Sequence, residues 1–139
     1  MIFSQGHALS RDEVGGVRDP DIRFALRSYL RQPQVEGGEL LVAEEMPICL
    51  GRTRVDVATV SDRLCGFEIK SQLDTLARLH SQLRDYGAVF DEITLVIGLK
   101  HLTGILSELP TWCGILLAHR SDGEVKLEPG SYHLMFMGL

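Results

Sequence analysis

Residues 54–71 decide the fold, and they read Arg54-Val-Asp-Val-Ala-Thr-Val-Ser-Asp-Arg-Leu-Cys-Gly-Phe-Glu-Ile-Lys-Ser71. Two short runs rich in β-branched and apolar residues flank a polar turn at residues 61–63. This pattern predicts a β-hairpin with strands over residues 53–60 and 64–71. The hairpin is the expected position of the functional side chains.

The two strands of this hairpin are expected to bring charged side chains together. Side chains alternate between the two faces of a strand, so Glu68 and Lys70 share one face while Phe67 and Ile69 share the other. We therefore expect one face to be apolar core and the other to carry charge. With the turn centred on residue 62, Asp56 lies opposite Glu68, with the two Cβ atoms about 5 Å apart.

Two carboxylates in such a position repel each other, and a partly buried pair shares a proton or needs a cation between its members. Magnesium meets this need, because it prefers oxygen ligands and takes one or two protein carboxylates while keeping several waters; manganese is the alternative ion. Lys70 beside the pair can activate a metal-bound water or neutralise charge on a phosphate. The structural alternative is a solvated face with a cross-strand ion pair.

The order of Asp56, Glu68 and Lys70, with eleven residues between the first two, resembles the PD-(D/E)XK nuclease superfamily. On the following segment, Gln82-x-x-x-Tyr86 is similar to the Q-x-x-x-Y motif of its RecB-type branch. The resemblance covers residues 40–101. It implies a member of a small prokaryotic or phage family within that superfamily.

This resemblance implies a Mg²⁺-dependent deoxyribonuclease that hydrolyses DNA phosphodiester bonds in repair, defence or mobile-element processing. Val55 stands where the family name has proline, a departure that touches no ligand. The implied catalytic residues are Asp56, Glu68, Lys70, Gln82 and Tyr86. The implied metal ligands are Asp56, Glu68, the carbonyl of Ile69 and Glu45, with Glu44 in reserve. For the last two, the alternative role is a solvated strand end.

Basic residues near these motifs are expected to hold DNA phosphates. The expected contacts are Arg54, Arg78, Lys100 and His101. Scattered solvated charges are the alternative for each arginine and lysine, and a polar strand terminus is the alternative for the histidine. A net charge of −5 and a pI near 5.5 differ from those of a strongly basic nucleic-acid binder. They favour weak or assisted binding, through a protein partner or a homodimer.

The rest of the chain predicts an α/β fold: a restriction-endonuclease-like αβββαβ core whose mixed central sheet is flanked by helices, with C-terminal strand additions. Residues 91–99 are almost continuously apolar and predict a strand buried on both faces. The other expected elements are a helix capped by Asp19 that ends before Pro33, a strand over 40–50, helices over 73–86 and 102–109, and strands over 112–118, 124–128 and 132–137.

Length and composition predict one globular domain over residues 1–139, with residues 1–18 as a flexible leader. We expect a cytoplasmic protein with no membrane contact, because no apolar run is long enough to cross a bilayer and no signal-peptide pattern is present. Three cysteines without C-x-x-C spacing predict neither a disulfide framework nor a zinc site.

Two alternatives to a nuclease remain open from the sequence. One is a non-cleaving nucleic-acid-binding accessory subunit that keeps a nuclease-like fold. Two unpaired carboxylates facing each other argue against it, because a site without metal has no physical reason to keep them. The other alternative is a small-molecule phosphoesterase, which would need an enclosed pocket in place of an open groove.

Overall fold

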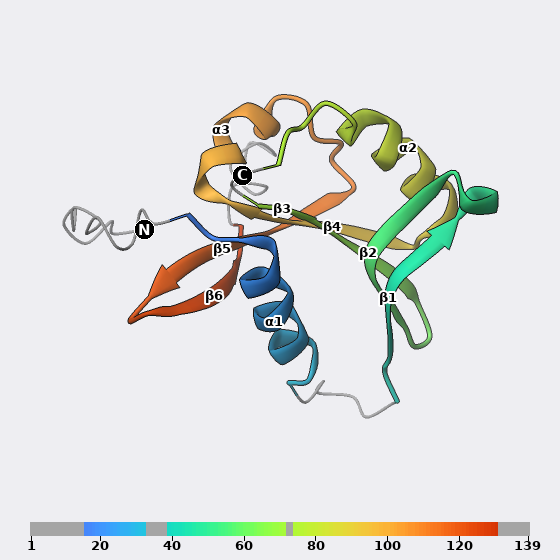
Figure 1. Ribbon diagram of the computed structural model, residues 1–139. Coiled ribbons are helices and arrows are strands. Elements are labelled where there is room, and N and C mark those ends of the chain that lie inside the picture. The colour runs from blue at the N-terminus through green and yellow to red at the C-terminus, as the bar shows by residue number, and fades with distance from the viewer. Residues whose placement is uncertain (1–15, 33–38, 72–73, 131–139) are drawn as a thin grey trace.

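Six strands form one mixed sheet with helices on both of its faces (Figure 1), in a computed structural model that describes residues 16–32, 39–71 and 74–130. The predicted α/β class is therefore confirmed. The elements are α1 (Asp19–Leu30), β1 (Leu41–Ile48), η1 (Cys49–Gly51), β2 (Thr53–Val60), β3 (Leu64–Lys70), α2 (Leu79–Val89), β4 (Glu92–Gly98), α3 (Leu99–Leu106), β5 (Cys113–Ser121) and β6 (Glu124–Pro129).

The strands lie side by side in the order in which they occur along the chain, from β1 to β6. Strands β1, β2 and β3 pair antiparallel, β3, β4 and β5 pair parallel, and β6 returns antiparallel to β5. The helix α2 connects β3 to β4 and α3 connects β4 to β5, so each parallel pair is a βαβ unit. This is the expected αβββαβ core, with α3 and the β5–β6 hairpin added after it.

The hairpin formed by β2 and β3 has the predicted register. Val57 pairs with Phe67 and Val60 with Leu64, and the same register places Asp56 opposite Glu68. The turn between the strands covers residues 61–63, as the polar Ser-Asp-Arg sequence predicts. The fold therefore brings the two carboxylates together through local pairing alone.

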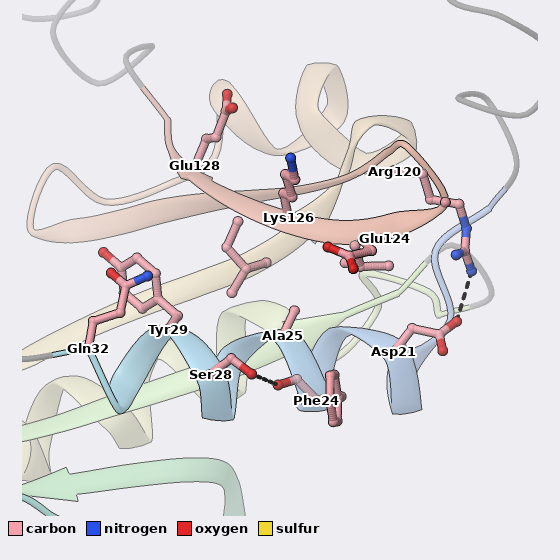
Figure 2. A pocket seen from close by; sticks show the side chains of 13 residues that line it. Asp21, Phe24, Ala25, Ser28, Tyr29, Gln32, Arg120, Glu124, Lys126 and Glu128 are labelled. Atoms are coloured by element: carbon pink, nitrogen blue, oxygen red, sulfur yellow. Dashed lines mark hydrogen bonds and ion pairs between the residues drawn. The ribbon is translucent and has the colours of Figure 1, made fainter.

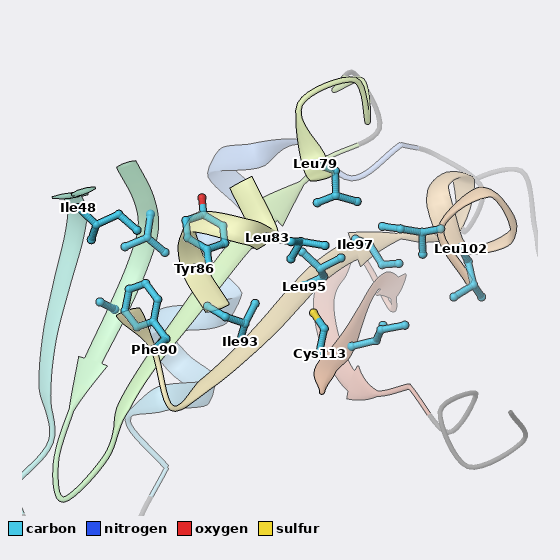
Figure 3. Close-up of a cluster of buried hydrophobic side chains, with 14 residues drawn as sticks. Ile48, Leu79, Leu83, Tyr86, Phe90, Ile93, Leu95, Ile97, Leu102 and Cys113 are labelled. Atoms are coloured by element: carbon cyan, nitrogen blue, oxygen red, sulfur yellow. The ribbon is translucent and has the colours of Figure 1, made fainter. Parts of the chain in front are cut away.

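Both faces of the sheet are covered by helices, and each covered face has its own apolar core. The α2-side core packs Leu79, Leu83 and Tyr86 of α2 and residues of α3 onto the sheet (Figure 3). The α1-side core packs Ile22 and Leu26 of α1 onto the opposite face. The prediction of one core face and one merely charged face is therefore corrected, because Glu68 and Lys70 lie on the face covered by α2, beside the α2-side core, and are only 3% and 6% exposed.

Helix α1 ends before Pro33, as predicted, but its start differs by one residue. Arg18 is the N-cap residue, and Asp19 lies in the first turn, where its negative charge is favourable at the helix N-terminus. Val17 is buried, so it is not part of a flexible leader. Residues 1–15 of the expected leader lie outside the described residues.

Helix α2 begins at Leu79, not at residue 73. The backbone N–H and the hydroxyl of Ser71 both donate to Asp74 Oδ2, at 2.7 and 2.9 Å, and this closes a turn directly after β3. Arg78 is the N-cap residue and precedes the helix. Leu76 belongs to the leucine pattern that predicted a longer helix, but it lies in the loop before α2.

The C-terminal part agrees with the sequence up to β6. Asp122 and Gly123, with φ of 52° and 78°, connect β5 to β6 in a tight turn whose left-handed backbone suits an Asp-Gly pair. The strand predicted over residues 132–137 lies outside the described residues. Among the described helices, none is both long and apolar enough to span a membrane.

Candidate functional site

A polar groove of about 600 Å³ lies beside the β2–β3 hairpin, where α1, β1, η1 and the start of α2 meet. Its floor is formed by the ends of β2 and β3 that are remote from the hairpin turn, together with Asp19 of α1 and Glu45 of β1. Eight of the predicted site residues line it: Glu45, Arg54, Asp56, Glu68, Ile69, Lys70, Arg78 and Gln82. The fold therefore brings most of the predicted site together.

Asp56 joins β2 to β3 and to α1 through its carboxylate. The backbone N–H of Ile69 donates to Asp56 Oδ2 at 2.8 Å, and Arg23 Nη2 lies 3.1 Å from Oδ1. Burial raises the pKa of Asp56 above its ordinary value, and the Ile69 N–H and the Arg23 charge partly oppose this rise. Both oxygen atoms of this carboxylate therefore have protein donors.

Glu68 is held by the two residues of the Q-x-x-x-Y motif. Gln82 Nε2 donates to Glu68 Oε1 at 2.9 Å, and the Tyr86 hydroxyl donates to Oε2 at 2.5 Å. Burial and then the negative charge of Asp56 raise the pKa of Glu68 to about 7, against the effect of Tyr86 and Lys70. Glu68 therefore titrates near neutral pH.

Lys70 and Tyr86 are both buried, and both lie next to the carboxylate of Glu68. Lys70 Nζ lies 3.4 Å from Glu68 Oε1. Tyr86 is fully buried, and its hydroxyl oxygen also lies 3.2 Å from the carbonyl oxygen of Arg54. Burial and the adjacent Glu68 raise the pKa of Tyr86. Tyr86 does not line the groove, and it contacts the site through Glu68 and the backbone of Arg54.

Arg23, which no motif in the sequence marked as a site residue, lies on α1 and connects three acidic residues. Its Nε lies 2.6 Å from Asp19 Oδ1, and its Nη2 lies 2.6 Å from Glu45 Oε1 as well as near Asp56. Burial lowers the pKa of Arg23, but the hydrogen bond and charge of Asp19 and the charges of Asp56 and Glu45 outweigh this, so the net pKa is raised. The sequence held one local signal for this role. Asp19 lies four residues before Arg23, and oppositely charged residues four apart can pair on a helix.

Glu45 occupies an uncommon backbone conformation. Its φ of 53° lies in the left-handed region, which costs a non-glycine residue about 1–2 kcal/mol. Its two oxygen atoms contact Arg23 and Arg54, at 2.6 and 2.8 Å. These ion pairs help to stabilise the left-handed residue. Glu44, the reserve ligand, instead pairs with Arg27 at 2.7 Å and does not line the groove.

The donor set does not fit a resident magnesium ion in this arrangement. All four oxygen atoms of Asp56 and Glu68 already accept hydrogen bonds or ion pairs from protein groups. A guanidinium also supplies positive charge to Asp56 and Glu45. Within the described part of the chain, no group of three or more acidic, histidine or cysteine side chains is arranged to hold a metal ion. The predicted magnesium ligands Asp56 and Glu68 therefore already have protein partners in this arrangement.

Four exposed arginines surround the groove and form what we call the arginine rim: Arg52, Arg54, Arg78 and Arg84. The first three line the groove, and a smaller hollow lined by Arg52, Thr53, Ser81, Arg84 and Asp85 adjoins it. The side chains of Arg52 and Arg54 are 71% and 66% exposed although each has an acidic partner. Arginines and hydroxyl groups in this arrangement suit phosphate.

Lys100 and His101 lie away from the groove. Both belong to α3, because this helix begins immediately after β4 and replaces the strand end that the sequence predicted. His101 is buried, and its Nε2 lies 2.8 Å from the carbonyl oxygen of Ser71. The contact ties α3 to the end of β3, which is a structural role.

A second hollow of about 650 Å³ lies between α1 and β6 and contains none of the predicted site residues (Figure 2). Phe24, Ala25 and Tyr29 of α1 form one wall, and β6 forms the other. At one end, Arg120 Nη2 and Asp21 Oδ2 form an ion pair of 2.9 Å. The polar groove on the β2–β3 side is therefore the better candidate for function.

The raised pKa of Glu68 predicts a pH-dependent stability. Because the folded-state pKa lies above the ordinary 4.5, protonation of Glu68 favours the folded state; this stabilisation is complete below about pH 4.5 and is lost as the pH rises through about 7. Glu68→Gln imitates the protonated form, and rotation of the Gln82 amide would offer its unpartnered Oε1 to the new side chain. We expect the variant to melt a few degrees above wild type near pH 8 and no higher near pH 5.

Thermal unfolding across this pH range checks the prediction. Glu124→Gln, at an exposed position on β6, is the matched control and should follow the wild-type profile. A difference between Glu68→Gln and wild type that is the same at every pH would show that Glu68 does not titrate in this range.

Comparison with known proteins identifies the family. The protein-family model described as Bacteriophage P4 protein cII matches residues 14–129. The chain belongs to the bacteriophage P4 cII family. Among curated proteins, Protein cII of Enterobacteria phage P4 is 24% identical over 112 residues, which are 81% of this chain and 42% of that relative. The chain therefore spans less than half the length of this relative, and no solved structure matches it.

Membership of the P4 cII family corrects the interpretation as a RecB-type PD-(D/E)XK nuclease. The assignments as hydrolase, magnesium-dependent phosphodiesterase and deoxyribonuclease are therefore wrong as well. The physical reason lies in Arg23, Gln82 and Tyr86, which supply the positive charge and hydrogen bonds that the sequence analysis assigned to a metal. The objection to a non-cleaving protein, that its facing carboxylates would be unpaired, no longer holds for this cII family member.

Proposed function

We propose that this chain is a non-cleaving, DNA-binding accessory module in which the arginine rim contacts backbone phosphates. The observation that carries the proposal is the gathering of Arg52, Arg54, Arg78 and Arg84 around one groove and its adjoining hollow. Exposed guanidinium groups bind phosphate through charge and paired hydrogen bonds. Membership of the P4 cII family supports a role other than cleavage.

The charge distribution favours phosphates on the rim over phosphates on the floor of the groove. Asp19, Glu45, Asp56 and Glu68 line the floor, so a phosphate there would meet carboxylates. The adjoining hollow offers Arg84 and Ser81 beside a single carboxylate, Asp85, which Arg52 and Thr53 already contact. A nucleic-acid backbone would therefore follow the start of β2 and the N-terminal part of α2.

The net charge of −5 favours binding with the help of a partner, either another protein or a second copy of the chain. Rim arginines give a local positive surface on a protein that is acidic as a whole. Such a module would bind DNA weakly alone and more strongly in an assembly. This agrees with an accessory role.

Fluorescence anisotropy with labelled duplex DNA, single-stranded DNA and RNA tests the proposal, in EDTA and at about 50 mM salt, where phosphate contacts are strong. Arg78→Gln and Arg84→Gln are each expected to weaken DNA binding about three- to tenfold and to reduce the salt dependence by about one counterion. Arg31→Gln, at an exposed arginine after α1, is the matched control and should bind like wild type.

Two results would contradict the proposal. One is the absence of binding to any of the three nucleic acids, or an equal loss for Arg31→Gln. The other is cleavage of the DNA by wild type in Mg²⁺ that disappears in Lys70→Met. If RNA binds through the rim and DNA does not, the rim is the interface, but the proposal that its ligand is DNA is wrong.

A further inference from the structure

Four carboxylates from four different elements converge on the floor of the groove. Asp19 comes from α1, Glu45 from β1, Asp56 from β2 and Glu68 from β3. Like charges this close raise one another's free energy unless a cation or a proton compensates them. In agreement with this, the negative charge of Asp56 contributes, after burial, to the raised pKa of Glu68.

The guanidinium of Arg23 reaches three of these four carboxylates. The contacts are 2.6 Å to Asp19, 2.6 Å to Glu45 and 3.1 Å to Asp56, and they use Nε and Nη2. The Arg23 side chain is only 18% exposed, so it lies among the carboxylates and not above them in solvent. A planar group with five N–H donors suits several carboxylates at once, which a lysine does not.

The fourth carboxylate is satisfied separately. Gln82 and Tyr86 donate to its two oxygen atoms, and Lys70 lies 3.4 Å from one of them. The second oxygen atom of Asp56 accepts from the N–H of Ile69. A divalent ion between Asp56 and Glu68 would therefore have to compete with Arg23 and with these donors.

We propose that the guanidinium of Arg23 is the permanent counter-cation of this carboxylate cluster and takes the place of a divalent metal ion. The wild-type groove therefore has low affinity for Mg²⁺ and Mn²⁺. Removal of Arg23 takes away the cation that Asp19, Glu45 and Asp56 share, and it frees carboxylate oxygens of the kind that these ions prefer, although Arg54 still contacts Glu45 and the Ile69 N–H still contacts Asp56. The inference is independent of nucleic-acid binding, because it concerns only the groove floor.

Titration of the full chain with Mn²⁺, followed by the loss of the free-ion electron paramagnetic resonance signal, tests this directly. Arg23→Met removes the charge and keeps much of the apolar length of the side chain. We expect it to bind one Mn²⁺ at least about tenfold more tightly than wild type, because the charge of Arg23 no longer opposes Coulomb attraction of the ion to the three carboxylates. Mg²⁺ should compete for the same ion position.

Three further variants locate the effect. Arg27→Met removes the arginine one helical turn further along α1, which pairs with Glu44 outside the groove, and should titrate like wild type. Asp56→Asn added to Arg23→Met should abolish the gained affinity. Arg23→Lys keeps one charge that cannot reach all three carboxylates, so its affinity should lie between those of wild type and Arg23→Met.

The proposal is overturned if wild type binds Mn²⁺ as tightly as Arg23→Met and loses that binding in Asp56→Asn. It is also overturned if Arg23→Met has a wild-type circular dichroism spectrum and gains no affinity. If Arg23→Met does not fold, Arg23→Lys and the wild-type titration still decide between the two cations.

Discussion

Leu95→Ala is expected to lower the free energy of unfolding by about 2–5 kcal/mol, the usual cost of truncating a buried leucine. Leu95 lies in the middle of β4, is fully buried and belongs to the α2-side core. The adjacent Val96 is also fully buried but belongs to the α1-side core. Val96→Ala should therefore also be costly, by about 1.5–3 kcal/mol.

Urea unfolding of both variants measures whether β4 is packed on both faces. Lys126→Ala, at an exposed position on β6, is the control and should change stability by no more than about 0.5 kcal/mol. If one of the two β4 variants is as stable as wild type, the helix layer on that face does not pack as described.

Asp56→Ala is expected to lower the free energy of unfolding by about 1–3 kcal/mol, the cost of leaving a buried donor unsatisfied. The donor is the backbone N–H of Ile69, whose partner is Asp56 Oδ2. Ile69 is only 3% exposed, so water replaces the lost acceptor poorly. Arg23 loses one of its three carboxylates but keeps Asp19 and Glu45.

The same substitution should lower the pKa of Glu68, because the negative charge of Asp56 contributes to its rise. The pH dependence of stability would then move to lower pH, a readout that a purely structural loss would not produce. Asp56→Asn keeps an acceptor for Ile69 and should cost less than Asp56→Ala. Equal destabilisation by Ala and Asn, with no shift in the pH profile, would contradict both assigned contacts.

The hairpin could be predicted from the sequence because its determinants are local. Alternation of side chains has a period of two residues, and a turn centred on residue 62 fixes which residues face each other. The convergence of Asp56, Glu68, Gln82 and Tyr86 followed from the same pattern together with the resemblance. What the pattern could not supply was the function of the assembled site, because similar geometry serves different proteins.

Other features depend on contacts that no local pattern reports. Arg23 pairs with Glu45 and Asp56, which follow it by 22 and 33 residues, so only the packing of α1 against the hairpin reveals its role. The late start of α2 had a local signal in Ser71 and Asp74, whose spacing permits the observed hydrogen bonds. Leucine periodicity outweighed that signal in the sequence analysis. His101 was misplaced because α3 follows β4 without a loop.

The order of the strands in the sheet has a consequence for how the chain folds during synthesis. Each strand pairs with the one made just before it, so the nascent sheet can add strands one at a time as they leave the ribosome. Helix α1 has the opposite position, because it is made first and packs against residues from β2 to β6. The apolar side of α1 would therefore stay uncovered longest during synthesis. Chains that stop before β5 would leave that side exposed to solvent and would be prone to aggregate.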